Sequence, residues 1–310
     1  MSAAIKDWHP APGGDEACLR LNRGGTLYEE FTCRFPALSF TYSTPELTYD
    51  PIPMRDWMEE HPFVPIIACV MYAAMIVLGR MYFADKPRWN WRWTLAMWNL
   101  FLSVFSLIGF LRTAPAIFFV YTNYSWQENL CFDPEAHVGS GSVGVWVQLF
   151  VLSKFPELLD TFFIIIHKKP LILLHWYHHL SVLLYCWHSY VYKAGAGILF
   201  CVMNFAVHAI MYFYYFLMAA RCKPKWFQAF YITTAQISQM VVGVIATILC
   251  NYLYFVVQPA NCYLSKGNNI AGLVMYGSYL ALFLQFFLGR YFATSNKPIQ
   301  KSSSDNKKER

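Results

Sequence analysis

Charged residues are scarce in this chain of 310 residues, at 14% of the sequence against 57% hydrophobic residues. A soluble domain has about 25% charged residues, so the shortage excludes an ordinary soluble protein and indicates a membrane protein. The net charge of +6 is gathered in a few short regions. We therefore interpret it as a sign of membrane orientation, and we expect no nucleic-acid partner.

The missing charges leave long apolar runs along the chain. Several of them reach the roughly 20 residues that a helix needs to cross a bilayer. We predict an all-α polytopic membrane protein with seven transmembrane helices, preceded by an arm (1–62) and followed by a tail (294–310), with the helical domain over 63–293. The predicted helices span residues 65–83, 94–120, 143–166, 171–190, 197–218, 227–257 and 270–292.

Basic residues favour alternate loops. The loops between the basic regions have only Lys193 and Lys266. By the positive-inside rule, the basic loops and the C-terminus are cytosolic and the arm is lumenal. The last four residues (307–310) have the K-K-x-x form that retrieves membrane proteins to the endoplasmic reticulum, so we expect that location. The basic regions are 80–92, 168–169, 221–225 and 290–310.

The arm has no apolar region behind a basic start, and we see no secretory signal peptide in it. It is rich in Pro, Gly and Thr and has no helical period, so we expect it to be poorly ordered. On the same predicted side of the membrane, Cys131 and Cys262 lie in an oxidising compartment, which favours a disulfide between them. Asn123 begins a glycosylation sequon there, although its closeness to the membrane works against its use.

Three histidines occupy one face of the fourth predicted helix. His175, His178 and His179 have the spacing i, i+3 and i+4, and the range 171–190 contains no Asp, Glu, Lys or Arg. Titratable rings inside a transmembrane helix are costly to keep there, so they are candidates for function.

A polar stripe follows one side of the third predicted helix. Lys154, Glu157, Asp160 and Thr161 recur at spacings of three and four residues, and such a stripe must face the bundle interior or a wet cavity. It is either a structural ion-pair network or a charged cavity wall that orients the imidazoles, and the two interpretations are compatible. Pro156 is expected to bend this helix.

Further polar residues on three helices predict a chamber within the bundle. The fifth predicted helix places Asn204 and His208 one turn apart, where the neighbouring amide favours a functional role over simple packing. The sixth has Thr233 with two amides, which often only join helices. A chamber with a cytosolic mouth suits a ligand with a charged head and an apolar tail, such as acyl-CoA. The remaining members are Arg112, Tyr212, Tyr215, Gln236 and Gln239.

Three classes of function fit such a chamber. One is an enzyme that uses imidazole as general base or nucleophile on an acyl chain. Another is a membrane di-iron oxygenase, which needs about eight histidine ligands, whereas six lie near the predicted helices here and form one cluster; we therefore expect no metal. A transporter or receptor stays open. The six histidines are His167, His175, His178, His179, His188 and His208.

Four motifs follow one another along the chain. They are K-x-x-E-x-x-D-T (154–161), H-x-x-H-H (175–179), H-x-x-M-Y-x-Y-Y (208–215) and T-x-x-Q-x-x-Q (233–239). In this order and spacing the chain resembles the very-long-chain fatty acid elongases, the 3-oxoacyl-CoA synthases of the endoplasmic reticulum, over about 65–292. The resemblance implies that the last six helices form an inverted barrel around a narrow acyl tunnel.

The resemblance also implies condensation of acyl-CoA with malonyl-CoA to 3-oxoacyl-CoA, CoA and carbon dioxide, without a cofactor. It makes His178 the acyl acceptor and His175 and His179 its supports; the residues alone do not choose among the three. We expect His208 and Asn204 to stabilise negative charge. The form of the motifs favours saturated and monounsaturated acyl chains, with a polyunsaturated elongase as the alternative.

Further residues are assigned supporting roles in the expected site. Lys154 and Arg112 are candidates for the malonate carboxylate or for an internal ion pair, and Glu157 and Asp160 for orienting the imidazoles. Expected partners are membrane lipid and the reductase and dehydratase enzymes of the elongation cycle, with a homodimer as one option. Candidates for the CoA phosphates are Lys168, Lys169, Arg221 and Lys223.

Overall fold

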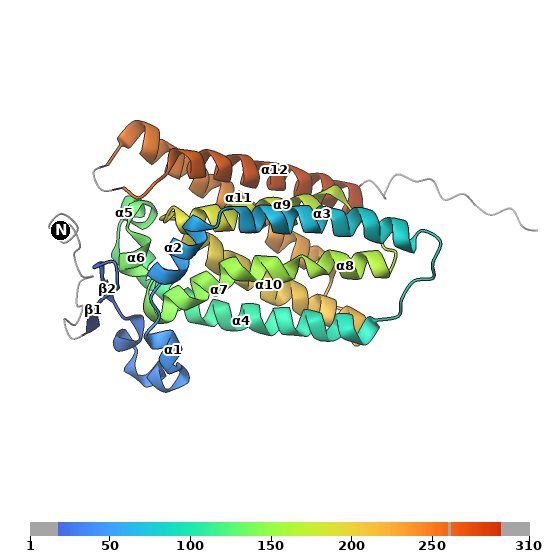
Figure 1. Ribbon diagram of the computed structural model, residues 1–310, viewed down its shortest axis with the longest axis horizontal. Coiled ribbons are helices and arrows are strands. Elements are labelled where there is room, and N and C mark those ends of the chain that lie inside the picture. The colour runs from blue at the N-terminus through green and yellow to red at the C-terminus, as the bar shows by residue number, and fades with distance from the viewer. Residues whose placement is uncertain (1–17, 260–261, 293–310) are drawn as a thin grey trace, which may run out of the picture.

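The computed structural model describes residues 18–259 and 262–292. Long helices run side by side along its longest axis and form an elongated bundle (Figure 1). This confirms the prediction of an all-α polytopic membrane protein. The long helices are α3 (Phe63–Phe83), α4 (Arg92–Asn123), α7 (Gly141–Glu157), α8 (Leu159–Ile166), α9 (Leu173–Val191), α10 (Gly197–Ala220), α11 (Ala229–Tyr252), which continues as a π-helical turn (Leu253–Val257), and α12 (Lys266–Tyr291).

Five of the described helices are long and apolar enough to cross a membrane: α3, α4, α10, α12 and α11 with its π-helical turn. The third predicted helix is divided between α7 and α8, because Pro156 lacks the N–H that would continue the hydrogen-bond ladder. The fourth predicted helix, α9, has four histidines among its 19 residues, which makes it less apolar. A total of seven spans therefore stays a prediction.

The two ends of the bundle differ (Figure 1). We call one the arm end, because it carries the described part of the arm together with α5 (Trp126–Cys131) and α6 (Pro134–His137). We call the other the tail end; the α3–α4 connection and the last turn of α12 lie there. The K-K-x-x residues 307–310 lie outside the described residues.

The helices pack as neighbours in a consistent pattern. α4 lies along α10 and α11 along α12, while α3 contacts α8 and α9 from outside. At the α4–α10 contact, a Cβ on Gly109 would stand 2.5 Å from the Phe205 ring, so only glycine lets these two helices come so close. The close packing of α4 against α10 therefore requires a residue without a side chain at position 109.

Residues 18–62 are folded, which differs from the poorly ordered arm expected from the sequence. Cys18 is bonded to Cys33, and buried Glu30 accepts a hydrogen bond from the Ser142 backbone N–H at 3.2 Å. These contacts with other parts of the chain hold the arm in a folded structure. A local periodicity in the sequence therefore does not predict it. The described elements are β1 (Leu19–Leu21) paired antiparallel with β2 (Leu27–Glu29), the 3-10 helices η2 (Phe31–Arg34) and η3 (Pro36–Thr41), α1 (Thr44–Leu47) and α2 (Ile52–Glu60).

The predicted pairing of Cys131 with Cys262 is present as a disulfide. It joins the end of α5 to the segment before α12, both at the arm end. Asn123 of the sequon is the last residue of α4, and its side-chain amide donates to the Phe119 carbonyl at 2.8 Å.

Replacing Cys131 by Ser should lower the thermal stability of the detergent-solubilised protein. Loss of a native disulfide that closes a long loop costs about 2–5 kcal/mol, chiefly because the unfolded chain gains freedom. Thermal unfolding measures the effect. Cys222→Ser is the matched control, since Cys222 is an exposed free thiol. Equal melting temperatures for the two variants would contradict a stabilising bridge.

Candidate active site

Two cavities meet in the middle of the bundle. The inner cavity extends toward the arm end and holds about 1060 Å³ of space, its open mouth included. The outer cavity extends toward the tail end and holds about 1230 Å³ on the same measure. Both are lined by His178, Asn204, Gln239 and Met240. A ligand that reaches from one cavity into the other would therefore pass these four side chains.

The two cavities differ in chemistry. The inner cavity is lined mainly by apolar and aromatic side chains from α7, α9, α10, α11 and α12. The outer cavity collects most of the predicted polar residues, which shows that their helical spacings did indicate inward-facing sides. Those that line it are Asp160, His175, His178, His179, Asn204, His208, Tyr212, Tyr215, Thr233, Gln236 and Gln239.

His178 is placed differently from its two neighbours on α9. The ring centroids of His175 and His179 lie 4.5 Å apart, and those of His178 and His179 lie 5.5 Å apart. His175 Nε2 forms a hydrogen bond of 2.9 Å with Thr161 Oγ1, which lies 2.7 Å from the Tyr72 hydroxyl. His175 and His179 line only the outer of these two cavities, whereas His178 lines both. We call the place where the two cavities meet the junction. His178 is therefore the histidine of α9 best placed to contact a ligand that extends through the junction from one cavity into the other.

A buried ion pair lies behind the junction. Lys154 Nζ donates to Glu157 Oε1 at 2.7 Å and to Asn204 Oδ1 at 3.1 Å. Glu157 Oε1 also accepts from Ser153 and lies 4.0 Å from His208 Nδ1. Neither charged residue lines either cavity. The interpretation of the stripe as a structural ion-pair network thus holds for Lys154 and Glu157. Lys154 contacts Asn204 and Glu157 lies beside His208, so the pair influences the cavity through these two lining residues.

Asp160 is the member of the stripe that faces the outer cavity. Its two carboxylate oxygens accept hydrogen bonds from Trp98 Nε1 at 2.7 Å and from the Tyr212 hydroxyl at 2.6 Å. The Tyr212 and Tyr215 rings pack edge to face. The side-chain hydrogen bonds of Asp160 thus go to Trp98 and Tyr212 and to none of the described imidazoles. Trp98 of α4 was not predicted, because nothing in its spacing relates it to the stripe.

The amides on α11 have separate roles. Gln236 donates from Nε2 to the Met211 thioether sulfur Sδ at 3.2 Å, which joins α11 to α10. Thr233 donates to the Ala229 carbonyl of its own helix. Gln239 is buried and lines both cavities. The interpretation of helix joining fits Gln236, while Gln239 belongs to the junction.

Arg112 lines neither cavity, which corrects its predicted place in the chamber; it forms an internal ion pair, one of the two predicted alternatives, with a partner in the arm. Its Nε donates to Glu46 Oε1 in α1 at 3.1 Å, and its guanidinium lies 3.7 Å from the centre of the Tyr42 ring. The arm thus supplies the partner of this intramembrane charge. No pattern in the sequence indicated that the arm reaches α4.

Glu46 is well suited to hold this cation. Burial alone would raise its pKa, but hydrogen bonds from Ser43 and Trp146 and the charge of Arg112 hold the pKa of the carboxyl below its ordinary value. The carboxylate is therefore ionised at neutral pH, and the contact fixes the arm to the bundle.

The basic residues expected to meet CoA phosphates do not line either cavity. Lys168 Nζ donates to two backbone carbonyls of the α3–α4 connection, and Lys223 Nζ donates to two carbonyls of its own loop. Lys169 is exposed, and Arg221 ends α10 in a left-handed conformation. Their place in a phosphate site stays a prediction.

Arg290 lines the outer cavity and was missed. A signal was available, because Phe283, Phe286 and Arg290 follow the spacing i, i+3 and i+7 of one helix face. All three line the outer cavity. The last turn of α12 therefore places a cation beside the polar chamber.

Within the part of the chain that the structure describes, no three His, Cys, Asp or Glu side chains are arranged to hold a metal ion. The outer cavity instead combines histidines with tyrosines and amides. The expected absence of a metal stays a prediction.

These features define a class: an all-α membrane protein with a buried histidine cluster where two cavities meet. The chain belongs to the ELO family, described as the GNS1/SUR4 family, whose model matches residues 57–299. The predicted family is thereby confirmed, and the chain is an enzyme of fatty acid elongation.

Named relatives agree with this family. The chain is 39% identical over 239 residues to very long chain fatty acid elongase 6 of Drosophila melanogaster, covering 77% of this chain and 75% of the relative. It is 39% identical over 271 residues to fatty acid elongase 3 of Trypanosoma brucei brucei, covering 79% and 89%. It is also 39% identical over 242 residues to human very long chain fatty acid elongase 6, covering 78% and 89%.

Replacing Lys154 by Met should destabilise the protein more than replacing both partners. The single change leaves Glu157 charged, buried and unpaired, which costs about 3–5 kcal/mol. The double variant Lys154→Met/Glu157→Gln removes both charges and should recover part of the loss. Thermal unfolding of the two variants and the wild type in detergent measures this. A double variant less stable than Lys154→Met would show that the ion pair is not the stabilising contact.

Proposed function

We propose that this protein condenses long-chain acyl-CoA with malonyl-CoA to give 3-oxoacyl-CoA, CoA and carbon dioxide, through an acyl intermediate on His178. The observation that carries the proposal is the position of His178, which lines both cavities. The acyl tail lies in the apolar inner cavity and the CoA portion in the polar outer cavity. The thioester then lies at the junction.

In the first half reaction, a ring nitrogen of His178 attacks the thioester carbonyl. An N–C bond forms, the C–S bond breaks, and CoA leaves as a thiolate that takes up the proton released by the imidazole. Imidazole suits this step because it is a good nucleophile near neutral pH and also a good leaving group. His175 is held by Thr161 and supports the cluster.

A neutral donor, the Asn204 amide, faces the negative charge that develops on the carbonyl oxygen. Asn204 Oδ1 already accepts from Lys154, so its Nδ2 hydrogens are left for the cavity. His208 lines the same cavity with Nδ1 4.0 Å from Glu157 Oε1, so its neutral ring carries the proton on Nδ1 and presents Nε2 to the cavity as an acceptor. Donors fixed in advance inside a site that excludes water stabilise an oxyanion strongly.

In the second half reaction, malonyl-CoA loses carbon dioxide and becomes an enolate. The enolate carbon attacks the acyl-imidazole carbonyl, a C–C bond forms, and the N–C bond to His178 breaks. The departing imidazolate takes up one proton from water, which restores the neutral imidazole, and 3-oxoacyl-CoA leaves through the outer cavity. The same donor, the Asn204 amide, serves the oxygen of the enolate, and the reaction needs no cofactor.

The wider setting follows from this reaction. The form of the motifs favours saturated and monounsaturated chains as substrates, with polyunsaturated chains as the alternative. We place the protein in the endoplasmic reticulum membrane, with the basic tail end in the cytosol where both CoA esters are available. Its 3-oxo product requires a reductase and then a dehydratase, which we propose as partners.

Replacing His178 by Ala should reduce condensation about a thousandfold or more, because the group that carries the acyl chain is lost. The purified enzyme is assayed with labelled malonyl-CoA and a panel of acyl-CoAs. His167→Ala is the matched control: this ring bonds only to the Phe163 carbonyl among the described residues, lines neither cavity, and should leave activity unchanged.

The intermediate is also directly observable. Incubation of the wild type with acyl-CoA alone should release CoA and add one acyl mass to the peptide that contains His178. The His178→Ala protein should show neither change. Substantial 3-oxoacyl-CoA synthesis by a well-folded His178→Ala protein would disprove the nucleophilic role.

A further inference from the structure

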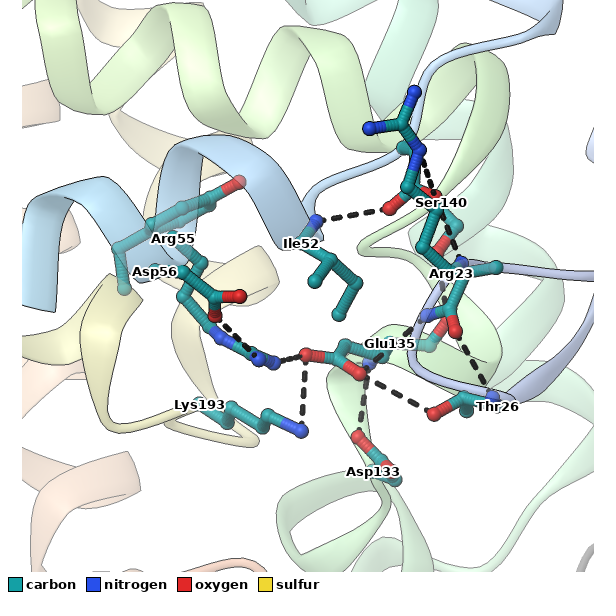
Figure 2. A network of polar contacts seen from close by, with 12 residues as sticks. Arg23, Thr26, Ile52, Arg55, Asp56, Asp133, Glu135, Ser140 and Lys193 are labelled. Carbon is teal, nitrogen blue, oxygen red and sulfur yellow. Dashed lines mark hydrogen bonds and ion pairs between the residues drawn. The ribbon is translucent and has the colours of Figure 1, made fainter.

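A cluster of charges lies at the arm end of the bundle (Figure 2). Glu135 of α6 is buried, with 4% of its surface exposed. Its Oε1 accepts from Lys193 Nζ at 2.9 Å and from Arg55 of α2, and its Oε2 accepts from the Thr26 hydroxyl at 3.3 Å and from Asn22. Two arm residues outside α2 thus complete the surroundings of one carboxylate. We call Arg55, Glu135 and Lys193 the charged cluster.

All three members of the charged cluster line the inner cavity. The cavity follows one side of α9 from His178 past Val182 and Cys186 to Tyr190, and Lys193 follows just after that helix. His178 therefore lies at one end of this lining and the charged cluster at the other. Burial lowers the pKa of Lys193, as expected for a group partly removed from water.

We propose that the arm, through Arg55 paired with Glu135 and Lys193, forms the far wall of the acyl site and sets the longest acyl chain that the enzyme accepts. The proposal rests on the proposed function, because it takes the inner cavity as the acyl site. A methyl end that reached the charged cluster would have to separate the buried Glu135 carboxylate from its partly buried cations, and it could offer no hydrogen bond in return. Chains that stop short of the cluster avoid this cost.

The length of this cavity gives an expected limit. His178 and Tyr190 are 12 residues apart on α9, or about 18 Å at 1.5 Å per residue. An extended chain advances about 1.2 Å per covalent bond, as a backbone of three bonds per residue does. The cavity therefore accommodates an acyl chain of roughly 16 carbons between the nucleophile and the charged cluster.

The wall is held firmly by the arm. The Tyr49 hydroxyl lies 3.0 Å from the Tyr190 hydroxyl, Trp187 Nε1 donates to the Met58 carbonyl at 3.2 Å, and the Met58 side chain is fully buried. The family match begins at residue 57, so Arg55 precedes it, while Glu135 and Lys193 lie within it. The arm thus adds Arg55 to a wall whose other two charges come from the matched region.

The test uses the full-length protein with two variants that change the limit in opposite directions. Arg55→Ala removes one side chain of the far wall. It should raise activity on 20-carbon relative to 16-carbon acyl-CoA on the order of tenfold, because further methylenes of the longer chain become buried in the space that Arg55 leaves. Ala194→Leu fills the same end of the cavity, which Ala194 lines, and should shift the preference to shorter chains. Arg23→Ala is the control: Arg23 is exposed, lies on the arm and lines neither cavity.

Two readouts separate this inference from the proposed function. Thermal stabilisation by acyl-CoAs of increasing length reports binding, and labelled malonyl-CoA reports synthesis. A shifted length optimum for binding in either folded variant, with Arg23→Ala unchanged, supports the wall. Length profiles identical to the wild type in both variants would overturn it. Length-dependent binding without any synthesis by the wild type would overturn the proposed function alone.

Discussion

The ion pair between Lys154 and Glu157 is the contact on which the centre of the molecule depends. Two opposite charges this deep in an apolar bundle are stable only when they stay paired and hydrogen-bonded. Because Lys154 also holds Asn204 and Glu157 lies beside His208, the pair fixes α7 against α10. Charges that never reach the cavity thus decide which way the Asn204 amide and the His208 ring point, and His178 lies beside polar groups that are oriented in advance.

Much of this centre follows from the sequence for a simple reason. A polar side chain in a transmembrane helix must face inward, so spacings of three and four residues identify the inner face without any knowledge of the neighbours. This is why the residues on α9, α10 and α11 gather around one cavity as predicted. It is also why Pro156, which cannot donate a backbone hydrogen bond, correctly indicates the break between α7 and α8.

The remainder depends on contacts between distant parts of the chain, which periodicity does not encode. The arm is ordered by pairs such as Glu30 with Ser142, which are 112 residues apart. Arg112 pairs with Glu46 of the arm, 66 residues away along the chain, so the spacing of residues on the membrane helices could not identify this partner. The choice of His178 over His175 and His179 likewise needs the shape of two cavities, since all three rings share one helix face.

The one-sided closure of the bundle has a kinetic consequence. At the arm end, the disulfide between Cys131 and Cys262 and the folded arm tie the loops together. For the proposed reaction the acyl site is then a blind passage: the methyl end goes in first and comes out last. A product lengthened by two carbons must withdraw completely before it can start another cycle. Such an enzyme works distributively, and its neighbours in the pathway, rather than the enzyme itself, determine whether the chain grows again.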